Sequence, residues 1–233
     1  MHGQAGYSLI EIAIVLVIIG LLLGGVLKGQ ELITSARVRN LISQQDGVRA
    51  AYFGFLDRFR ALPGDYGLAT ANIAGATANG NGNNQIEFAA ACAAPCQSPE
   101  YIVVWEHLSR AGFVNGIYTF APAPETFASV PGNPFGAYVQ VVLDNAYGTG
   151  PAGPPVPAMR HNIKTGNRIP SGILAEIDRK IDDGDPLGGA FQFSVYGGGS
   201  GGTAPTGPGG CYAAGPPASW RASVTNCGGA SLL

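Results

Sequence analysis

Charged residues are scarce in this chain. Only 12% of its 233 residues are Asp, Glu, Lys or Arg, and the formal net charge at pH 7 is −2. Proteins that bind DNA or RNA need a concentrated basic surface to attract phosphate groups. The near-neutral composition supplies no such field, so we expect no nucleic-acid partner.

Residues with catalytic side chains are also few. One of the three histidines is at position 2, which leaves His107 and His161. The residues from Gly198 to Gly202 satisfy the Gly-x-Ser-x-Gly pattern of hydrolases, but no helix pattern follows them and no catalytic triad is visible. We therefore expect a protein that is not an enzyme, with Trp105 in the core and His107 at its rim.

The beginning of the chain, by contrast, is a long apolar run. Tyr7 to Leu27 contains one charged residue, Glu11. At about 1.5 Å per helical residue, this run is long enough to cross roughly 30 Å of hydrocarbon. A secretory signal sequence fits less well, because its apolar core has about 7–15 residues and its cleavage site has small residues of the Ala-x-Ala type.

The carboxylate of Glu11 needs an explanation within this run. A charge at the membrane centre costs on the order of 2.5–3.5 kcal/mol, and less near the membrane surface. One interpretation is that Glu11 reaches the lipid headgroups. The other is that it pairs with an amino group, because burying an unpaired charge is unfavourable.

The segment Gly6-Tyr7-Ser8-Leu9-Ile10-Glu11 resembles the N-terminus of type IV pilins and type II secretion pseudopilins. In that family a membrane peptidase cuts after the glycine and methylates the new amino group. The resemblance implies processing between Gly6 and Tyr7, N-methylation of Tyr7, and an assembly role for Glu11, which would pair with the N-terminus of a neighbouring subunit. Since residues 1–6 contain no Lys or Arg, we expect the start codon to lie upstream.

Beyond Lys28 the apolar residues recur at helical spacings, which predicts that the same helix continues as an amphipathic spine. Pro63 and Gly64 should end it. We therefore predict a leader (1–6), a long helix (7–62) with a membrane or filament-core part (7–27) and a spine (28–62), and a head (63–233). The apolar positions of the spine are Leu41, Val48, Tyr52, Phe55, Phe59 and Leu62.

The head should have an α+β fold, with a small antiparallel sheet packed on the long helix and connected by long Gly/Pro-rich loops. Helices are predicted from Tyr101 to Phe113 and from Ser171, as its N-cap, to Ile181. Clusters of β-forming residues between turn signals predict strands at 116–120, 137–143 and 191–196.

Four cysteines lie in the part of the chain that would leave the cytoplasm, where disulfides can form. Three pairings are possible, and we favour the local one, Cys92 with Cys96 and Cys211 with Cys227. The second pair would close a C-terminal loop, as in many type IV pilins. A zinc site is the less favoured alternative, because there is no Cys-x-x-Cys pair with matching histidines.

One acidic loop is a candidate metal site. Asp182, Asp183 and Asp185 follow the predicted helix that ends at Ile181, and clustered carboxylates can bind calcium. Their spacing is not that of an EF-hand, and aspartates also stabilise turns by accepting backbone hydrogen bonds. We expect either no cofactor or calcium at this loop.

Together, these features predict a structural subunit, major or minor, of a type IV pilus-like filament. A type II secretion pseudopilin is the alternative, and a pilin-anchored adhesin or DNA-uptake module is a third reading. The expected partners are other pilin subunits, prepilin peptidase and an inner-membrane assembly platform. The precursor would cross the bacterial inner membrane once and then enter an extracellular or periplasmic filament.

Overall fold

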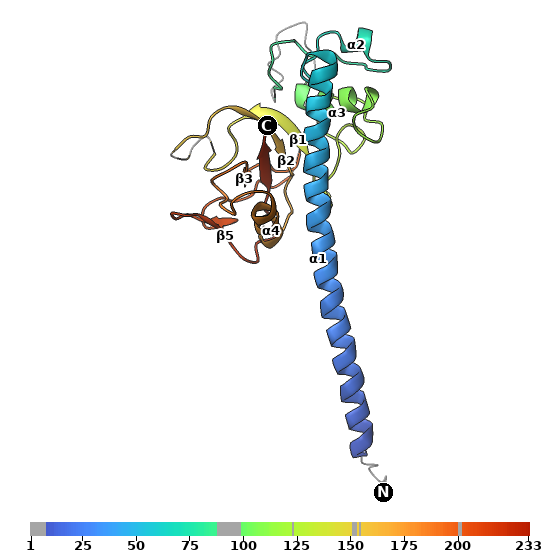
Figure 1. Cartoon of the computed structure of the whole chain (residues 1–233), viewed down its shortest axis with the longest axis vertical. Coiled ribbons are helices and arrows are strands. Elements are labelled where there is room, and N and C mark those ends of the chain that lie inside the picture. Colours follow the sequence, from blue (N-terminus) through green and yellow to red (C-terminus); the bar gives the residue numbers. More distant parts are fainter. Residues whose placement is uncertain (1–7, 88–98, 123, 151–152, 154, 200–201) are drawn as a thin grey trace.

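The computed structural model describes residues 8–87, 99–122, 124–150, 153, 155–199 and 202–233. One helix, α1 (Leu9–Phe59), contains 51 residues and projects far beyond the head (Figure 1). Ser8 is its N-cap. At the other end Arg60 takes a left-handed conformation with φ of 54°, and its N–H donates to Leu56 O, so the helix ends just before Pro63.

The C-terminal half of α1 is the spine on which the head packs. Its buried residues recur every three or four positions and so form one face. This confirms the predicted amphipathic spine. The buried residues are Val38, Leu41, Gln45, Val48, Ala51, Tyr52 and Phe55.

The head contains a four-stranded antiparallel sheet in the order β1-β2-β6-β3. The C-terminal strand β6 lies between β2 and β3, so the chain end is held inside the sheet. A separate pair, β4 and β5, forms a short hairpin. The bounds are β1 Gln140–Asp144, β2 Arg160–Lys164, β3 Phe191–Phe193, β4 Tyr212–Ala213, β5 Ser219–Trp220 and β6 Gly229–Leu232.

Three shorter helices complete the head. They are α2 (Ala69–Asn72), α3 (Glu100–Arg110) and α4 (Ser171–Ile181). One apolar core joins α1 to α3 and β1, with Trp105 and Phe55 fully buried. A second core joins α1 to α4 and β3 around Leu174, next to the disulfide between Cys211 and Cys227.

This arrangement confirms the predicted α+β fold with a long N-terminal helix and a small antiparallel sheet. Helix α4 has the predicted bounds, and α3 begins one residue before the predicted start and ends at Arg110. The two predicted strands that do form are shorter than expected, because β1 starts at Gln140 and β3 ends at Phe193.

Three local predictions are wrong. Residues 116–120 form no strand, because Ser109 and Glu106 of α3 accept hydrogen bonds from the backbone N–H groups of Tyr118 and Phe120. The N-cap of α4 is Pro170, and Ser171 Oγ instead accepts from Val224 N. His107 is fully buried rather than at the rim of the core.

Candidate functional site

The N-terminal part of α1 is an apolar surface that the head leaves uncovered. Its most apolar 18-residue window has a mean hydropathy of 2.8, and none of that window is buried. Leu9 and Leu21, for example, are 89% and 74% exposed. A continuous apolar surface of this size requires a cover of lipid or protein.

Glu11 lies in the first turn of this exposed helix. Its Oε2 accepts a hydrogen bond from Ser8 N at 2.8 Å, and Ser8 Oγ accepts from Ile10 N at 3.4 Å. This reciprocal capping box places the carboxylate beside the backbone of the residue that follows Tyr7. Gly6 and Tyr7, the predicted processing and methylation residues, lie outside the described residues.

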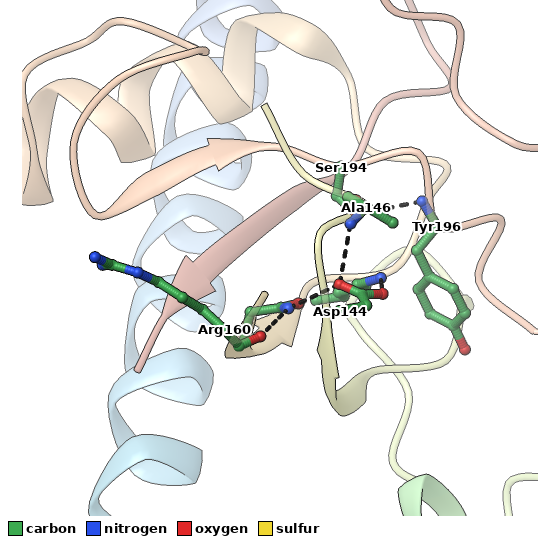
Figure 2. Close-up of polar contacts among 7 residues, drawn as sticks. Asp144, Ala146, Arg160, Ser194 and Tyr196 are labelled. Carbon is green, nitrogen blue, oxygen red and sulfur yellow. Dashed lines mark hydrogen bonds and ion pairs between the residues drawn. The ribbon is translucent and has the colours of Figure 1, made fainter. Parts of the chain in front are cut away.

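A buried polar cluster lies within the head (Figure 2). Asp144, at the end of β1, forms an ion pair with Lys164 of β2 and accepts from Asn162 Nδ2 at 2.9 Å and Ala146 N at 3.2 Å. The Lys164 ammonium also lies 5.8 Å from the centre of the Tyr196 ring. Burial lowers the pKa of Lys164, and the charge of Asp144 opposes that shift.

Two carboxylates, Asp65 after α1 and Glu106 in α3, hold the segment from Thr77 to Asn84 in place. The Asp65 carboxylate accepts from the backbone N–H groups of Gly82, Asn83 and Asn84 at 2.6–3.0 Å. Glu106, fully buried in α3, accepts from the backbone of Thr77 at 2.9 Å. The described residues from Thr77 to Asn84 are therefore held by hydrogen bonds that compensate buried carboxylates.

His107 contributes to the same loop as a neutral side chain. Burial lowers its pKa, so the uncharged ring is favoured. Its Nδ1 accepts from Gly64 N at 3.0 Å, and Nε2 lies 2.9 Å from Ala78 O, to which it can donate. These two bonds use both ring nitrogens and give His107 a structural role.

Glu100 should make the head more stable in mild acid. Burial, together with the charges of Asp65 and Glu87, raises its pKa to about 7, while hydrogen bonds from Asn81 N and Glu87 N oppose the shift. The folded chain therefore takes up a proton near pH 7, whereas the unfolded chain does so only near pH 4.5. Since the folded state binds more protons between these values, its stability increases as the pH falls from 7 towards 4.5.

We expect this contribution to have a slope of at most about 1.4 kcal/mol per pH unit. Urea unfolding of the detergent-solubilised chain, followed by tryptophan fluorescence at several pH values, measures it. Glu100→Gln should flatten the dependence, whereas Glu176→Gln, on the partly exposed side of α4, should leave it unchanged. An equal slope in wild type and Glu100→Gln would contradict the assignment.

The acidic loop after α4 differs from the predicted ligand set. Oxygens of Asp178, Asp182 and Asp183 lie within 4.8 Å of one another, and among the described residues Asp185 is not part of this group. Asp185 Oδ1 instead accepts from Leu187 N at 2.9 Å. Burial, followed by the charges of Asp182 and Asp183, raises the pKa of Asp178 to about 6.

The C-terminal cysteines are joined as predicted. Cys211 and Cys227 form a disulfide with Cα atoms 5.7 Å apart. Both cysteines are fully buried in the second core. The bridge joins Cys211, directly before β4, to Cys227, which follows β5. Cys92 and Cys96 lie outside the described residues, so their pairing stays a prediction.

The polar residues that shape the head were missed by sequence reasoning. The strand β2, with the sequence Arg160-His-Asn-Ile-Lys164, has only one aliphatic side chain and no alternating apolar pattern. Its Asn162 and Lys164 face Asp144 only because the register pairs β2 with β1. A signal existed for Glu106, since it lies within the helix predicted from Tyr101 to Phe113, whereas Glu100 lies one residue before that helix.

Comparison with known proteins agrees with the exposed apolar start of α1. Residues 1–27 match the family model for the prokaryotic N-terminal methylation motif, which is the prepilin signature of type IV pilins and pseudopilins. No curated protein and no solved structure matches the chain. The exposed apolar helix and this motif together suggest the class of membrane-anchored prepilin-type precursors.

More specifically, the motif supports a type IV pilin-like or pseudopilin-like precursor. Proteins with this motif are structural subunits rather than enzymes. The motif implies processing by prepilin peptidase and assembly with other pilin subunits.

Proposed function

We propose that this protein is a pilin that polymerises into a type IV pilus-like filament through the N-terminal half of α1. The observation that carries the proposal is the uncovered apolar surface from Leu9 to Leu27, with Glu11 in its first turn. Lipid covers this surface in the precursor. In the filament, the same surface of neighbouring subunits would replace lipid as the cover.

The position of Glu11 supports a mechanism for docking. Processing before Tyr7 would create a charged amine at the end of α1, close in sequence to the Glu11 carboxylate. When a subunit leaves the membrane, the carboxylate of one subunit would pair with the amine of its neighbour. This pairing sets the axial position of the new subunit, because any other position would bury two unpaired charges.

The head supports a pilus rather than a secretion pseudopilin. It displays long Gly/Pro-rich loops around a small sheet, and several of them lie on the side away from α1 (Figure 1). A displayed surface serves a filament that reaches outside the cell. A short periplasmic filament has no evident use for it.

The test is to image sheared surface filaments of the native host with a subunit-specific label and to determine the subunit's N-terminus by mass spectrometry. Labelled filaments whose subunits begin at a methylated Tyr7 are expected. Processed subunits found only in the cell envelope would reject the pilus and favour a pseudopilin. An unprocessed N-terminus would reject both forms of filament subunit.

We further propose that the head binds calcium at Asp178, Asp182 and Asp183. Their oxygens are hard ligands, and a cation would offset the repulsion among three neighbouring carboxylates. Each residue also accepts a hydrogen bond from within the head, which fixes the carboxylates in place: Gly184 N to Asp178, Phe191 N to Asp182 and Asp185 N to Asp183.

Calcium should therefore raise the melting temperature of the detergent-solubilised chain relative to EDTA. At a calcium concentration a hundredfold above the Kd, the stabilisation is about 2.7 kcal/mol. Asp183→Asn should remove most of the increase, whereas Asp185→Asn should retain it because Asp185 lies outside the group. Equal melting temperatures in calcium and EDTA would reject the site.

A further inference from the structure

The head contains three copies of the dipeptide Asn-Gly, as Asn79-Gly80, Asn81-Gly82 and Asn115-Gly116. The backbone nitrogen of the residue after an asparagine can attack the side-chain amide and displace ammonia. Glycine favours this reaction because it has no Cβ to obstruct the approach. The attack requires a backbone N–H that can lose its proton and an amide that can turn towards it. Since the three dipeptides are chemically identical, the folded structure must distinguish them.

The first dipeptide is held by hydrogen bonds and by crowding. Gly80 N donates to Tyr66 O at 3.1 Å, and Asn79 Oδ1 accepts from Thr70 N at 2.9 Å. Gly80 is also buried so tightly that a Cβ atom at this position would overlap the backbone of Asp65. The nitrogen and the side-chain amide would have to break these hydrogen bonds in order to react.

The second dipeptide is held by a carboxylate. Gly82 N donates to Asp65 Oδ1 at 2.6 Å, and a bond of this kind is stronger than one between neutral groups. The negative charge of the carboxylate also opposes loss of the proton from Gly82 N. The Asn81 side chain is held at both ends, since Nδ2 donates to Glu87 Oε2 at 2.9 Å and Oδ1 accepts from Asn83 N at 2.9 Å.

The third dipeptide, in the loop after α3, has none of these restraints. Asn115 and Gly116 are both exposed. Among the described residues, no group accepts a hydrogen bond from Gly116 N, and the Asn115 side chain makes none. A Cβ atom on Gly116 would meet nothing closer than 3.7 Å, so the space beside its nitrogen is open. The amide and the nitrogen can therefore approach each other without breaking a bond.

We propose that Asn115 is a site of spontaneous deamidation in the folded protein. Gly116 N loses its proton to hydroxide and attacks Asn115 Cγ. The C–N bond of the side-chain amide then breaks, ammonia leaves with a proton from water, and a succinimide ring forms. Water opens the ring at either carbonyl and leaves aspartate or isoaspartate at position 115. The net reaction consumes one water molecule and releases one ammonia, without an enzyme.

The modification changes both the charge and the backbone of the head. It adds one negative charge to a chain whose formal net charge at pH 7 is −2. Isoaspartate also lengthens the backbone of the loop after α3, in which Phe113 packs edge to face on Phe55 of α1 with ring centres 6.1 Å apart. Old and new molecules should therefore differ at this surface. The inference concerns the folded chain and does not depend on which filament it joins.

Peptide mapping by mass spectrometry measures the reaction. The detergent-solubilised full chain is incubated at mildly alkaline pH, sampled over time and digested briefly at acidic pH. Aspartate and isoaspartate should accumulate at position 115 at least about tenfold faster than at position 81, because reaction at Gly82 N first requires loss of its bond to the Asp65 carboxylate. Equal or faster conversion of Asn79 or Asn81, or no conversion of Asn115, would overturn the proposal.

Unfolding supplies the matched control. In guanidinium chloride the three dipeptides should react at similar rates, because the hydrogen bonds at Gly80 and Gly82 are then lost. If the preference for Asn115 persists in the unfolded chain, local sequence rather than the fold selects the site, and the proposal fails. Asn115→Gln should remove the product at position 115 and leave the slow conversion of Asn79 and Asn81 unchanged, because glutamine forms the corresponding ring far less readily.

Discussion

Glu11→Ala will insert into the membrane at the wild-type level but will not enter filaments. In the apolar interior of a filament, the variant leaves the amine of a neighbouring Tyr7 without its carboxylate. Removing one partner of a buried ion pair costs about 3–5 kcal/mol, which corresponds to a loss of more than about a hundredfold in incorporation. Quantitative immunoblots of membrane fractions and sheared filaments measure the two quantities separately.

Glu11→Gln separates this charge effect from helix capping. The Glu11 carboxylate also accepts from Ser8 N, and a glutamine can make the same capping hydrogen bond without a charge. We expect Glu11→Gln to be as defective as Glu11→Ala. Recovery of filaments by Glu11→Gln would show that capping rather than charge pairing matters. Glu31→Ala, which removes an exposed carboxylate paired with Lys28 on the same helix, is the control and should assemble normally.

Lys164→Met will destabilise the head by about 3–5 kcal/mol. The Lys164 side chain is 3% exposed, and its ammonium is paired with Asp144 on the neighbouring strand. Methionine fills much of the same volume but removes the cation, so that among the described residues the Asp144 carboxylate keeps its hydrogen bonds from Asn162 and Ala146 (Figure 2). Urea unfolding of the detergent-solubilised chain, followed by tryptophan fluorescence, measures the loss.

The double variant Lys164→Met/Asp144→Leu tests whether the loss comes from an unpaired charge. Replacing both partners of a buried pair by apolar residues is often neutral, so the double variant should recover most of the stability. Arg160→Met removes an exposed cation from the same strand and should change stability by no more than about 0.5 kcal/mol. A double variant as unstable as Lys164→Met would show that packing, not charge, explains the effect.

Helices were predicted more accurately than strands because their signals are local. The spacing of Leu41, Val48, Tyr52 and Phe55 predicts the buried face of the spine directly. The antiparallel sheet is different, since β6 lies between β2 and β3 although more than 30 residues separate it from either strand. Pairing over such distances depends on the whole head, and strands of two to five residues have too few positions to show a period.

The same contrast holds for the candidate sites. Glu11 is conspicuous in the sequence because a carboxylate in an apolar run is costly wherever that run is placed. Lys164 is unremarkable in the sequence, and its importance follows from burial beside Asp144. In the acidic loop, the sequence predicted a group of Asp182, Asp183 and Asp185, whereas the structure groups Asp178 with Asp182 and Asp183, because the Asp178 side chain reaches the loop from the last turns of α4.

The sequence by itself determined the long apolar helix, the glutamate within it and the match to the N-terminal methylation motif, because each depends on the composition of one continuous segment. Tertiary structure decided which carboxylates hold the segment from Thr77 to Asn84 and which aspartates gather after α4. These features bring together residues that are distant in the chain. Their energies come from burial and from the pairing of buried polar groups, and both exist only after the head has folded.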